Sequence, residues 1–169
     1  MILLNGYKKN AVYKMNRNAT VTLKDVTGKS VTSNFNESWN NFYDYMTQIN
    51  TNRSDLKSHG VVFGTGNTAP ALGDYCLSGD FIKGFAASYA IEQTDADDGY
   101  TMSVVYTITN NNSEAITIGE VGIVEYAHNG NSVKGYALTE RTALDTPVTI
   151  PAGGVGQITY TIRLNYPTA

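Results

Sequence analysis

The feature that most constrains the fold is the alternation of apolar and polar residues along several short segments. In residues 158–166 every second residue is apolar and the residues between them are polar. Residues 100–110 show the same period of two. Because successive side chains of a strand point to opposite faces of a sheet, this period predicts strands with one buried face. Turn sequences such as His128-Asn-Gly-Asn131 separate these segments and favour hairpin connections.

Short strands at this spacing, with no alternation of strands and helices, predict a mainly β chain built as an antiparallel β-sandwich. Both a jelly-roll and an immunoglobulin-like topology fit the pattern. Two features interrupt it. The apolar parity changes between Ile118 and Val121, which predicts a β-bulge at Gly119-Glu120. The sequence Asp145-Thr-Pro147 predicts a turn before a last short strand at Val148–Ile150.

The first 60 residues read differently from the rest. Residues 19–24 and 29–33 flank the turn-like Asp25-Val-Thr-Gly28, which predicts an N-terminal hairpin. Apolar residues then recur at helical spacing from Trp39 to Ile49, which predicts one short helix. We therefore expect a basic N-terminal arm with a β-hairpin over 1–35, an amphipathic helix and linker over 36–60, and the sandwich over 61–169.

Charge is distributed unevenly along the 169 residues, whose formal net charge is -3. The first 30 residues hold six basic side chains and one acid, Asp25, whereas the remaining 139 hold six basic and 14 acidic ones. The overall balance argues against a nucleic-acid partner, because neutralising phosphates needs a basic surface. The basic end predicts an arm that docks on an acidic surface of a partner or of a neighbouring copy. The candidate docking residues are Lys8, Lys9, Lys14 and Arg17.

Several short motifs resemble catalytic or metal-binding sequences, but the spacing of their residues does not fit those sites. Gly64-Thr-Gly66 resembles a dinucleotide-binding loop, but Pro70 and Gly73 follow where a helix should begin. Asp95-Ala-Asp97-Asp98-Gly99 lacks the later ligands of a calcium loop. Glu120 and Glu125 would share a strand face only through the bulge, and Cys76 has no activating His nearby in sequence. We expect no catalytic residues, no cofactor and no metal, and no membrane segment or secretion signal.

The 12 Tyr, together with many Asn, Ser, Thr and Gly, form a composition typical of adaptable recognition surfaces. Tyr106, Tyr160 and Tyr166 lie on the apolar parity and are predicted to be core residues. Tyr126, Asn129 and Tyr136 flank the predicted hairpin turn and form a candidate recognition loop for a glycan or a receptor.

Two stretches resemble structural proteins of tailed-bacteriophage virions. Val62-Phe-Gly-Thr-Gly-Asn-Thr-Ala-Pro70, followed by Asp74-Tyr-Cys-Leu77, resembles a "G-T-G-x-T-A-P … D-x-x-L" segment of that group. The second stretch resembles the end of their sandwich domain. It consists of Asn110, Ile116–Ile123 with Glu120, Ala137–Arg141, Pro147–Gly153 and Ile158–Leu164. The resemblance covers about residues 60–166 and not the first 60.

This resemblance implies a non-enzymatic virion component: a head decoration, a head or tail fibre, or a baseplate piece. It implies self-association, docking on other virion proteins, and synthesis in the cytoplasm of the bacterial host. In that arrangement the basic hairpin and the helix would attach the chain to the particle. A carbohydrate- or receptor-binding module is the alternative.

Overall fold

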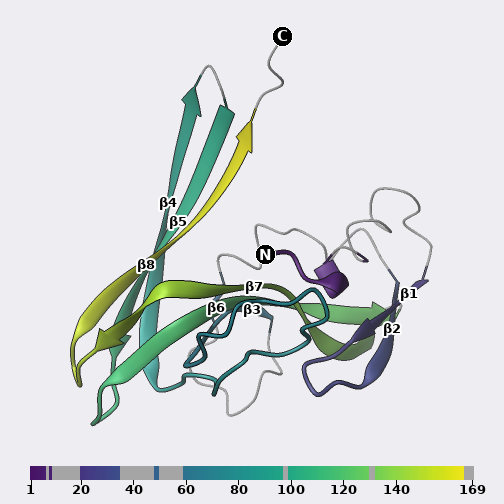
Figure 1. Ribbon diagram of the computed structural model, residues 1–169, viewed down its shortest axis with the longest axis horizontal. Helices are drawn as coiled ribbons and strands as arrows, with labels where there is room; N and C mark the ends of the chain where they lie inside the picture. Colours follow the sequence, from purple (N-terminus) through teal and green to yellow (C-terminus); the bar gives the residue numbers. More distant parts are fainter. Residues whose placement is uncertain are drawn as a thin grey trace. The chain divides into compact units, whose positions relative to one another are not determined.

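The computed structural model of the chain describes residues 1–6, 8, 20–34, 48–49, 59–96, 99–129 and 132–165. Within these residues the chain is mainly β, as predicted, and its sheets are antiparallel (Figure 1). The strands are β1 (Thr20–Lys24), β2 (Ser30–Asn34), β3 (Gly60–Gly64), β4 (Phe85–Ala96), β5 (Gly99–Asn110), β6 (Ile116–Asn129), β7 (Ser132–Ile150) and β8 (Val155–Asn165).

The predicted N-terminal hairpin is confirmed. β1 and β2 pair in antiparallel register from Thr20 opposite Asn34 to Lys24 opposite Ser30. The turn closes because Oδ1 of Asp25 accepts hydrogen bonds from the backbone N–H groups of Thr27 and Lys29, both at 2.9 Å. Gly28 follows at φ 84°, a left-handed conformation that glycine adopts without strain. Most of the predicted helix and linker at 36–60 lies outside the described residues.

The chain divides into two compact units, which are described separately. Unit 1 comprises Met1–Lys83 and Thr117–Val148, and unit 2 comprises Gly84–Ile116 and Thr149–Ala169. Unit 1 contains the β1–β2 sheet and the sheet ordered β3-β6-β7, whereas unit 2 contains the sheet ordered β4-β5-β8.

The core of unit 1 lies on both faces of the β3-β6-β7 sheet. On one side Leu23 and Val31 of the hairpin pack against Ala127 and Ala137 of β6 and β7. A second cluster joins residues of the sheet to the N-terminus and to the segment after β3, and consists of Leu3, Val62, Leu77, Val124 and Leu138. Residues 118–124 are all buried. This burial on both faces accounts for the change of apolar parity in β6, whose register with β3 is continuous from Glu120 to Val124.

The first residues of the chain belong to unit 1 rather than projecting from it. Leu3 N donates to Thr139 O at 2.8 Å and Arg141 N donates to Met1 O at 3.1 Å, so Met1–Leu3 run antiparallel beside β7. Asn5 continues the link, because its side chain donates to the carbonyl of Lys24 at 2.8 Å and accepts from the N–H of Lys24 at 3.0 Å. The N-terminal segment therefore joins the hairpin to β7.

Unit 2 is a three-stranded sheet with one apolar and one polar face. Val104, Tyr106 and Ile108 are buried, as the period of two in residues 100–110 predicted. Across the other face, the hydroxyls of Ser103 and Thr161 lie 3.0 Å apart. A buried Asn110 ties the turn before β8 to β5. Its amide donates to the carbonyls of Glu114, Ile150 and Pro151 at 2.8–3.1 Å.

The turn predicted at Asp145-Thr-Pro147 is wrong, because β7 runs unbroken for 19 residues from Ser132 to Ile150. Proline cannot donate a backbone hydrogen bond, so within sheets it is found on edge strands, at the first residue of a strand or at bulges. β7 is the last strand in its sheet, and the side chains from Asp145 to Pro147 are exposed. An edge strand can accommodate this Pro without losing a bond to a neighbouring strand.

Candidate functional site: a lysine-bearing face beside a buried ion-pair network

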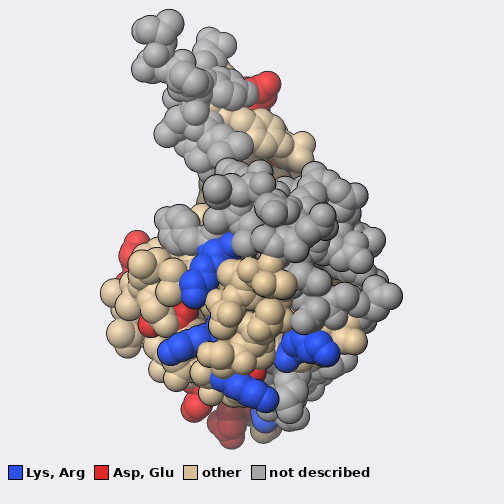
Figure 2. Space-filling view, turned by 90° about the vertical axis from the view of Figure 1, so that its right-hand side faces the viewer, with Lys and Arg blue, Asp and Glu red and all other residues tan. Residues whose placement is uncertain are grey.

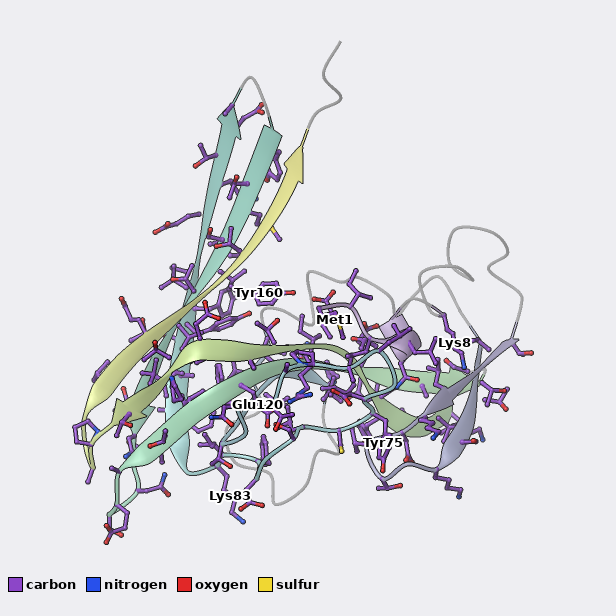
Figure 3. All side chains as sticks on the ribbon, viewed as in Figure 1. Met1, Lys8, Tyr75, Lys83, Glu120 and Tyr160 are labelled. Atoms are coloured by element: carbon purple, nitrogen blue, oxygen red, sulfur yellow. The ribbon has the colours of Figure 1, made fainter. Side chains whose placement is uncertain are left out.

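The most densely bonded group of polar side chains in unit 1 surrounds Glu120 of β6, which Figure 3 labels within the sheet. Glu120 is 0% exposed. Its Oε1 accepts from the N–H of Gly79 at 2.8 Å, and its Oε2 accepts from the N–H of Ser78 at 3.0 Å and the Ser78 hydroxyl at 3.2 Å. Nε of Arg141 donates to Oε2 at 2.6 Å. The carboxylate is therefore fully occupied by donors.

Arg141 of β7, 2% exposed, connects this carboxylate to the segment that follows β3. Its Nη1 forms an ion pair with Oδ2 of Asp74, and its Nη2 donates to the carbonyl of Thr68 at 2.6 Å. Asp74 in turn accepts from the N–H of Ala71 at 2.9 Å. We call this set the Glu120 network: Thr68, Asp74, Ser78, Gly79, Glu120 and Arg141.

Gly66 lies so close to the Glu120 network that no side chain fits. A Cβ atom on Gly66 would overlap Oγ of Ser78 and would stand 2.5 Å from Oε1 of Glu120. The glycines after β3, which resemble a nucleotide-binding loop in sequence, therefore have a packing role around a carboxylate. They let their own backbone pass close to Ser78 and Gly79, whose N–H groups donate to Glu120.

The electrostatics of the network fix Glu120 as an anion. Burial alone would raise the pKa of Glu120, but the hydrogen bonds from Ser78, Arg141 and Gly79 and the charge of Arg141 outweigh it, so the pKa lies below its ordinary value. A carboxylate held this way is a poor proton donor or acceptor near neutral pH. Burial, followed by the charge of Asp74, raises the pKa of the neighbouring Cys76 thiol. A raised pKa disfavours the nucleophilic thiolate.

The surface of unit 1 around the hairpin carries a second group, which we call the lysine face: Lys8, Lys24, Lys29 and Lys134. Figure 2 shows Lys and Arg side chains gathered on the side of the molecule where β1 and β2 lie in Figure 1. Nζ of Lys8 donates to the carbonyl of Thr22 in β1 at 3.1 Å. Nζ of Lys24 lies 5.4 Å from the ring centroid of Tyr75, a cation–π contact.

Lys134 joins this face from the opposite end of the sequence. The N–H of Val26 in the hairpin turn donates to the carbonyl of Tyr136 at 2.8 Å. A Cβ on Gly135 would lie 3.1 Å from Val31 of β2. β7 therefore runs directly under the hairpin and presents Lys134 beside it. Of the predicted docking residues, the structure places Lys8 on the lysine face, while Lys9, Lys14 and Arg17 lie outside the described residues.

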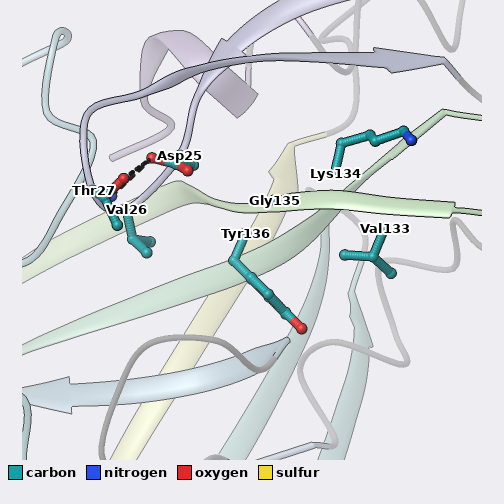
Figure 4. A pocket seen from close by; sticks show the side chains of 7 residues that line it. All are labelled: Asp25, Val26, Thr27, Val133, Lys134, Gly135 and Tyr136. Carbon is teal, nitrogen blue, oxygen red and sulfur yellow. Dashed lines mark hydrogen bonds between the residues drawn. The ribbon is translucent and has the colours of Figure 1, made fainter.

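A cavity of about 290 Å³ opens between the hairpin turn and the start of β7 (Figure 4). The turn contributes Asp25, Val26 and Thr27, and β7 contributes residues 133–136. Oδ1 of Asp25 is engaged by the hydroxyl of Thr27 at 2.6 Å as well as by the backbone of the turn. The cavity is lined by the apolar side chains of Val26 and Val133 together with Lys134 and Tyr136.

The predicted recognition residues are partly brought together. The rings of Tyr126 and Tyr136 lie 5.5 Å apart between centroids, and His59 lies 4.3 Å from Tyr126 on the centroid distance. Both tyrosines are half-buried, and Tyr136 lines the cavity. Asn129 ends β6, and its side chain lies outside the described residues. Sequence reasoning paired the two tyrosines but missed Lys134, Asp25 and the cavity between them.

No protein-family model, curated protein or solved structure matches this chain. In the part of the chain that the structure describes, no His, Cys, Asp and Glu side chains group as metal ligands would. Among the described residues, no helix is long and apolar enough to cross a membrane.

Proposed function

We propose that the chain is a non-enzymatic structural component of a tailed-phage virion, self-associating and docking on other capsid or tail proteins. One observation carries the proposal: the polar residues and glycines on which the resemblance depends meet in buried networks. Gly66, Asp74, Glu120 and Arg141 meet around one carboxylate, and Asn110 bonds to the carbonyl of Pro151 within unit 2.

Buried polar groups must all be satisfied together, so residues in such a network depend on one another. Gly66 and Arg141 contact the carboxylate of Glu120, and Asp74 joins them through Arg141, although these residues are spread over 76 positions of the sequence. Their convergence favours reading the resemblance as the signature of a shared fold. It supports the virion assignment because that assignment rests on the same residues.

The lysine face supplies what a docking component needs. It is an exposed basic surface on a chain whose net charge is negative. Such a surface steers and orients association with an acidic partner. A place in the virion, after synthesis in the host cytoplasm, follows from the same proposal.

The test is whether the chain co-purifies with phage particles. Phage particles from the culture that produces the chain are banded on a density gradient and analysed by quantitative mass spectrometry. We expect peptides of this chain in a fixed ratio to the major capsid or tail protein through repeated banding. Peptides confined to the soluble fraction would contradict the proposal.

A second candidate function, glycan or receptor binding, is favoured by the Tyr126–Tyr136 pair and the adjoining cavity. Aromatic rings beside polar groups suit the apolar faces and hydroxyls of sugars. A glycan array probed with the wild type and with Tyr136→Ala tests it. Tyr89→Ala is the matched control, because Tyr89 is 45% exposed but belongs to unit 2. Binding that Tyr136→Ala abolishes and Tyr89→Ala preserves would support this function.

A further inference from the structure

We propose that two copies of the chain pair through the outer edges of their β4 strands, so that two three-stranded sheets join into one six-stranded sheet. The contact is isologous, with β4 of one copy antiparallel to β4 of the other across a twofold axis. This inference rests on the proposed self-association and names the surface on which it depends. All of that surface belongs to unit 2.

β4 is an outer strand of its sheet, whose order is β4-β5-β8 (Figure 1). It pairs with β5 over all 12 of its residues in one continuous register. On its other side, no described residue outside the sheet bonds to the backbone of residues 86–94. Alternate residues of a strand direct their N–H and C=O groups to opposite sides, so this edge offers a row of donors and acceptors. Such an edge is a template for another strand.

The sheet edges of unit 1 are covered by other segments of the chain, in contrast to the β4 edge. β7 is bonded along its edge by Met1–Leu3 and by Val26, and β3 is bonded by Gln48 and Ile82. Lysine and proline are residues that keep edge strands from pairing. The 12 residues of β4 include no Lys, Arg or Pro, and nine of their side chains are exposed. The β4 edge is therefore both accessible and unprotected by these residues.

The open stretch of β4 fixes the register of the contact. In an antiparallel pair, a residue whose N–H and C=O point to the partner strand must face another of that kind. A twofold axis therefore places one residue opposite itself. Ala90, at the centre of residues 86–94, is the choice that uses the whole stretch, and its side chain is small and exposed. Glu92 then lies opposite Ser88, so the Glu92 carboxylates of the two copies do not face each other.

The same register continues the apolar face of unit 2 across the contact. Tyr89 lies opposite the buried Tyr106 of β5, and shares its face. Ile91 lies opposite the buried Val104 on that face. Tyr89 is 45% exposed, and with Ala90 opposite Ala90 it lies beside Ile91 of the other copy. Aromatic and β-branched side chains so placed stabilise a sheet. The edge is thus complementary to itself, which makes a second copy its occupant.

Sedimentation velocity of the full chain and of Ala90→Lys tests the contact. The contact is small, so we expect the wild type to dimerise at about 100 µM chain. Ala90→Lys sets two ammonium groups opposite each other, so the dissociation constant of the dimer should rise about tenfold or more. Thr159→Lys is the matched control and should dimerise like the wild type. Ala90 and Thr159 are both exposed and both lie opposite Val105, on the two outer strands of the sheet.

Cross-linking tests the register independently. Ala90→Cys treated with a short bis-maleimide should give a covalent dimer. Thr159→Cys should not, nor should the wild type, whose one cysteine is Cys76 of unit 1. Circular dichroism should show every variant folded.

Three results would each overturn the contact: a monomeric wild type, an Ala90→Lys variant that dimerises no more weakly than Thr159→Lys, or an Ala90→Cys variant that cross-links no more than the wild type. Particle incorporation without this dimer would leave the proposed function standing and remove the contact alone. A dimer in a chain that is absent from particles would remove the proposed function and leave the contact.

Discussion

Nε of Arg141 lies 2.6 Å from Oε2 of Glu120, and both side chains are excluded from solvent. The two residues come from adjacent strands, β7 and β6, while the remaining donors and acceptors come from the segment after β3. One ion pair therefore fixes the relation between the sheet of unit 1 and a long irregular segment.

Removing the cation should damage unit 1 more than neutralising the anion. Arg141→Met leaves a buried carboxylate without its ionic partner, which typically costs about 3–5 kcal/mol in the free energy of unfolding. In Glu120→Gln the amide oxygen can take the place of Oε2 and accept from Ser78 and Arg141, which leaves the N–H of Gly79 without its acceptor, so we expect about 1–3 kcal/mol. Urea unfolding of both variants measures this, with the exposed Lys134→Met as a control expected within about 0.5 kcal/mol.

The double variant provides the sharper comparison. Glu120→Gln with Arg141→Met should cost clearly less than the two single changes added together, because each removes the penalty that the other creates. Additive costs would show that the pair does not act as one unit.

The lowered pKa of Glu120 makes stability depend on pH in a definite direction. A carboxyl whose pKa is lower in the folded state stabilises the protein fully above its unfolded value, about 4.3, and loses that contribution as pH falls through the folded value. Unfolding free energies of wild type and Glu120→Gln, measured from pH 6 to pH 3, should therefore converge below about pH 4. A gap that stays constant over this range would show that the pKa of Glu120 is the same in both states.

Strands with one buried face could be predicted from the sequence, because apolar and polar residues alternate along them. Tyr106 and the β1–β2 turn at Asp25-Val-Thr-Gly28 are examples of residues whose role follows from near neighbours. Pro147 is an example of a residue whose structure could not be predicted from its neighbours in sequence. The sequence around it predicts a turn, but Pro147 lies within β7, an edge strand that continues through it. The outcome depended on the position of β7 in its sheet, which no local window contains.

The site was harder to predict because its members are far apart in sequence. Asp74 and Arg141 are 67 residues apart, and Lys134 meets the hairpin only through the packing of β7. One local signal was available. Glu120 stands in the otherwise apolar Ile118-Gly-Glu-Val-Gly-Ile123, and a buried acid needs a cationic partner. That signal points to a partner but cannot identify Arg141.

Gly66 should tolerate no side chain. In Gly66→Ala the new Cβ would overlap Oγ of Ser78 and crowd Oε1 of Glu120, so one of the donors to the carboxylate must move. Overpacking of this kind costs about 1–3 kcal/mol. Gly73→Ala is the matched control, because a Cβ on Gly73 meets nothing within 4 Å. Thermal unfolding should give a lower melting temperature for Gly66→Ala than for Gly73→Ala. Equal melting temperatures would contradict the close packing at Gly66.

The N-terminal residues should behave as core rather than as a removable arm. Leu3 is 0% exposed and packs with Val62, Leu77 and Leu138, whereas its neighbour Leu4 is 42% exposed. Leu3→Ala leaves a cavity in this cluster, so we expect a loss of about 2–5 kcal/mol in the free energy of unfolding. Leu4→Ala removes the same atoms from the surface and should change it by less than about 0.5 kcal/mol. Urea denaturation measures the free energy of unfolding of both variants. If Leu3→Ala is as stable as Leu4→Ala, the segment Met1–Leu3 contributes little to the stability of unit 1. A chain shortened by these residues would then fold as well as the whole chain.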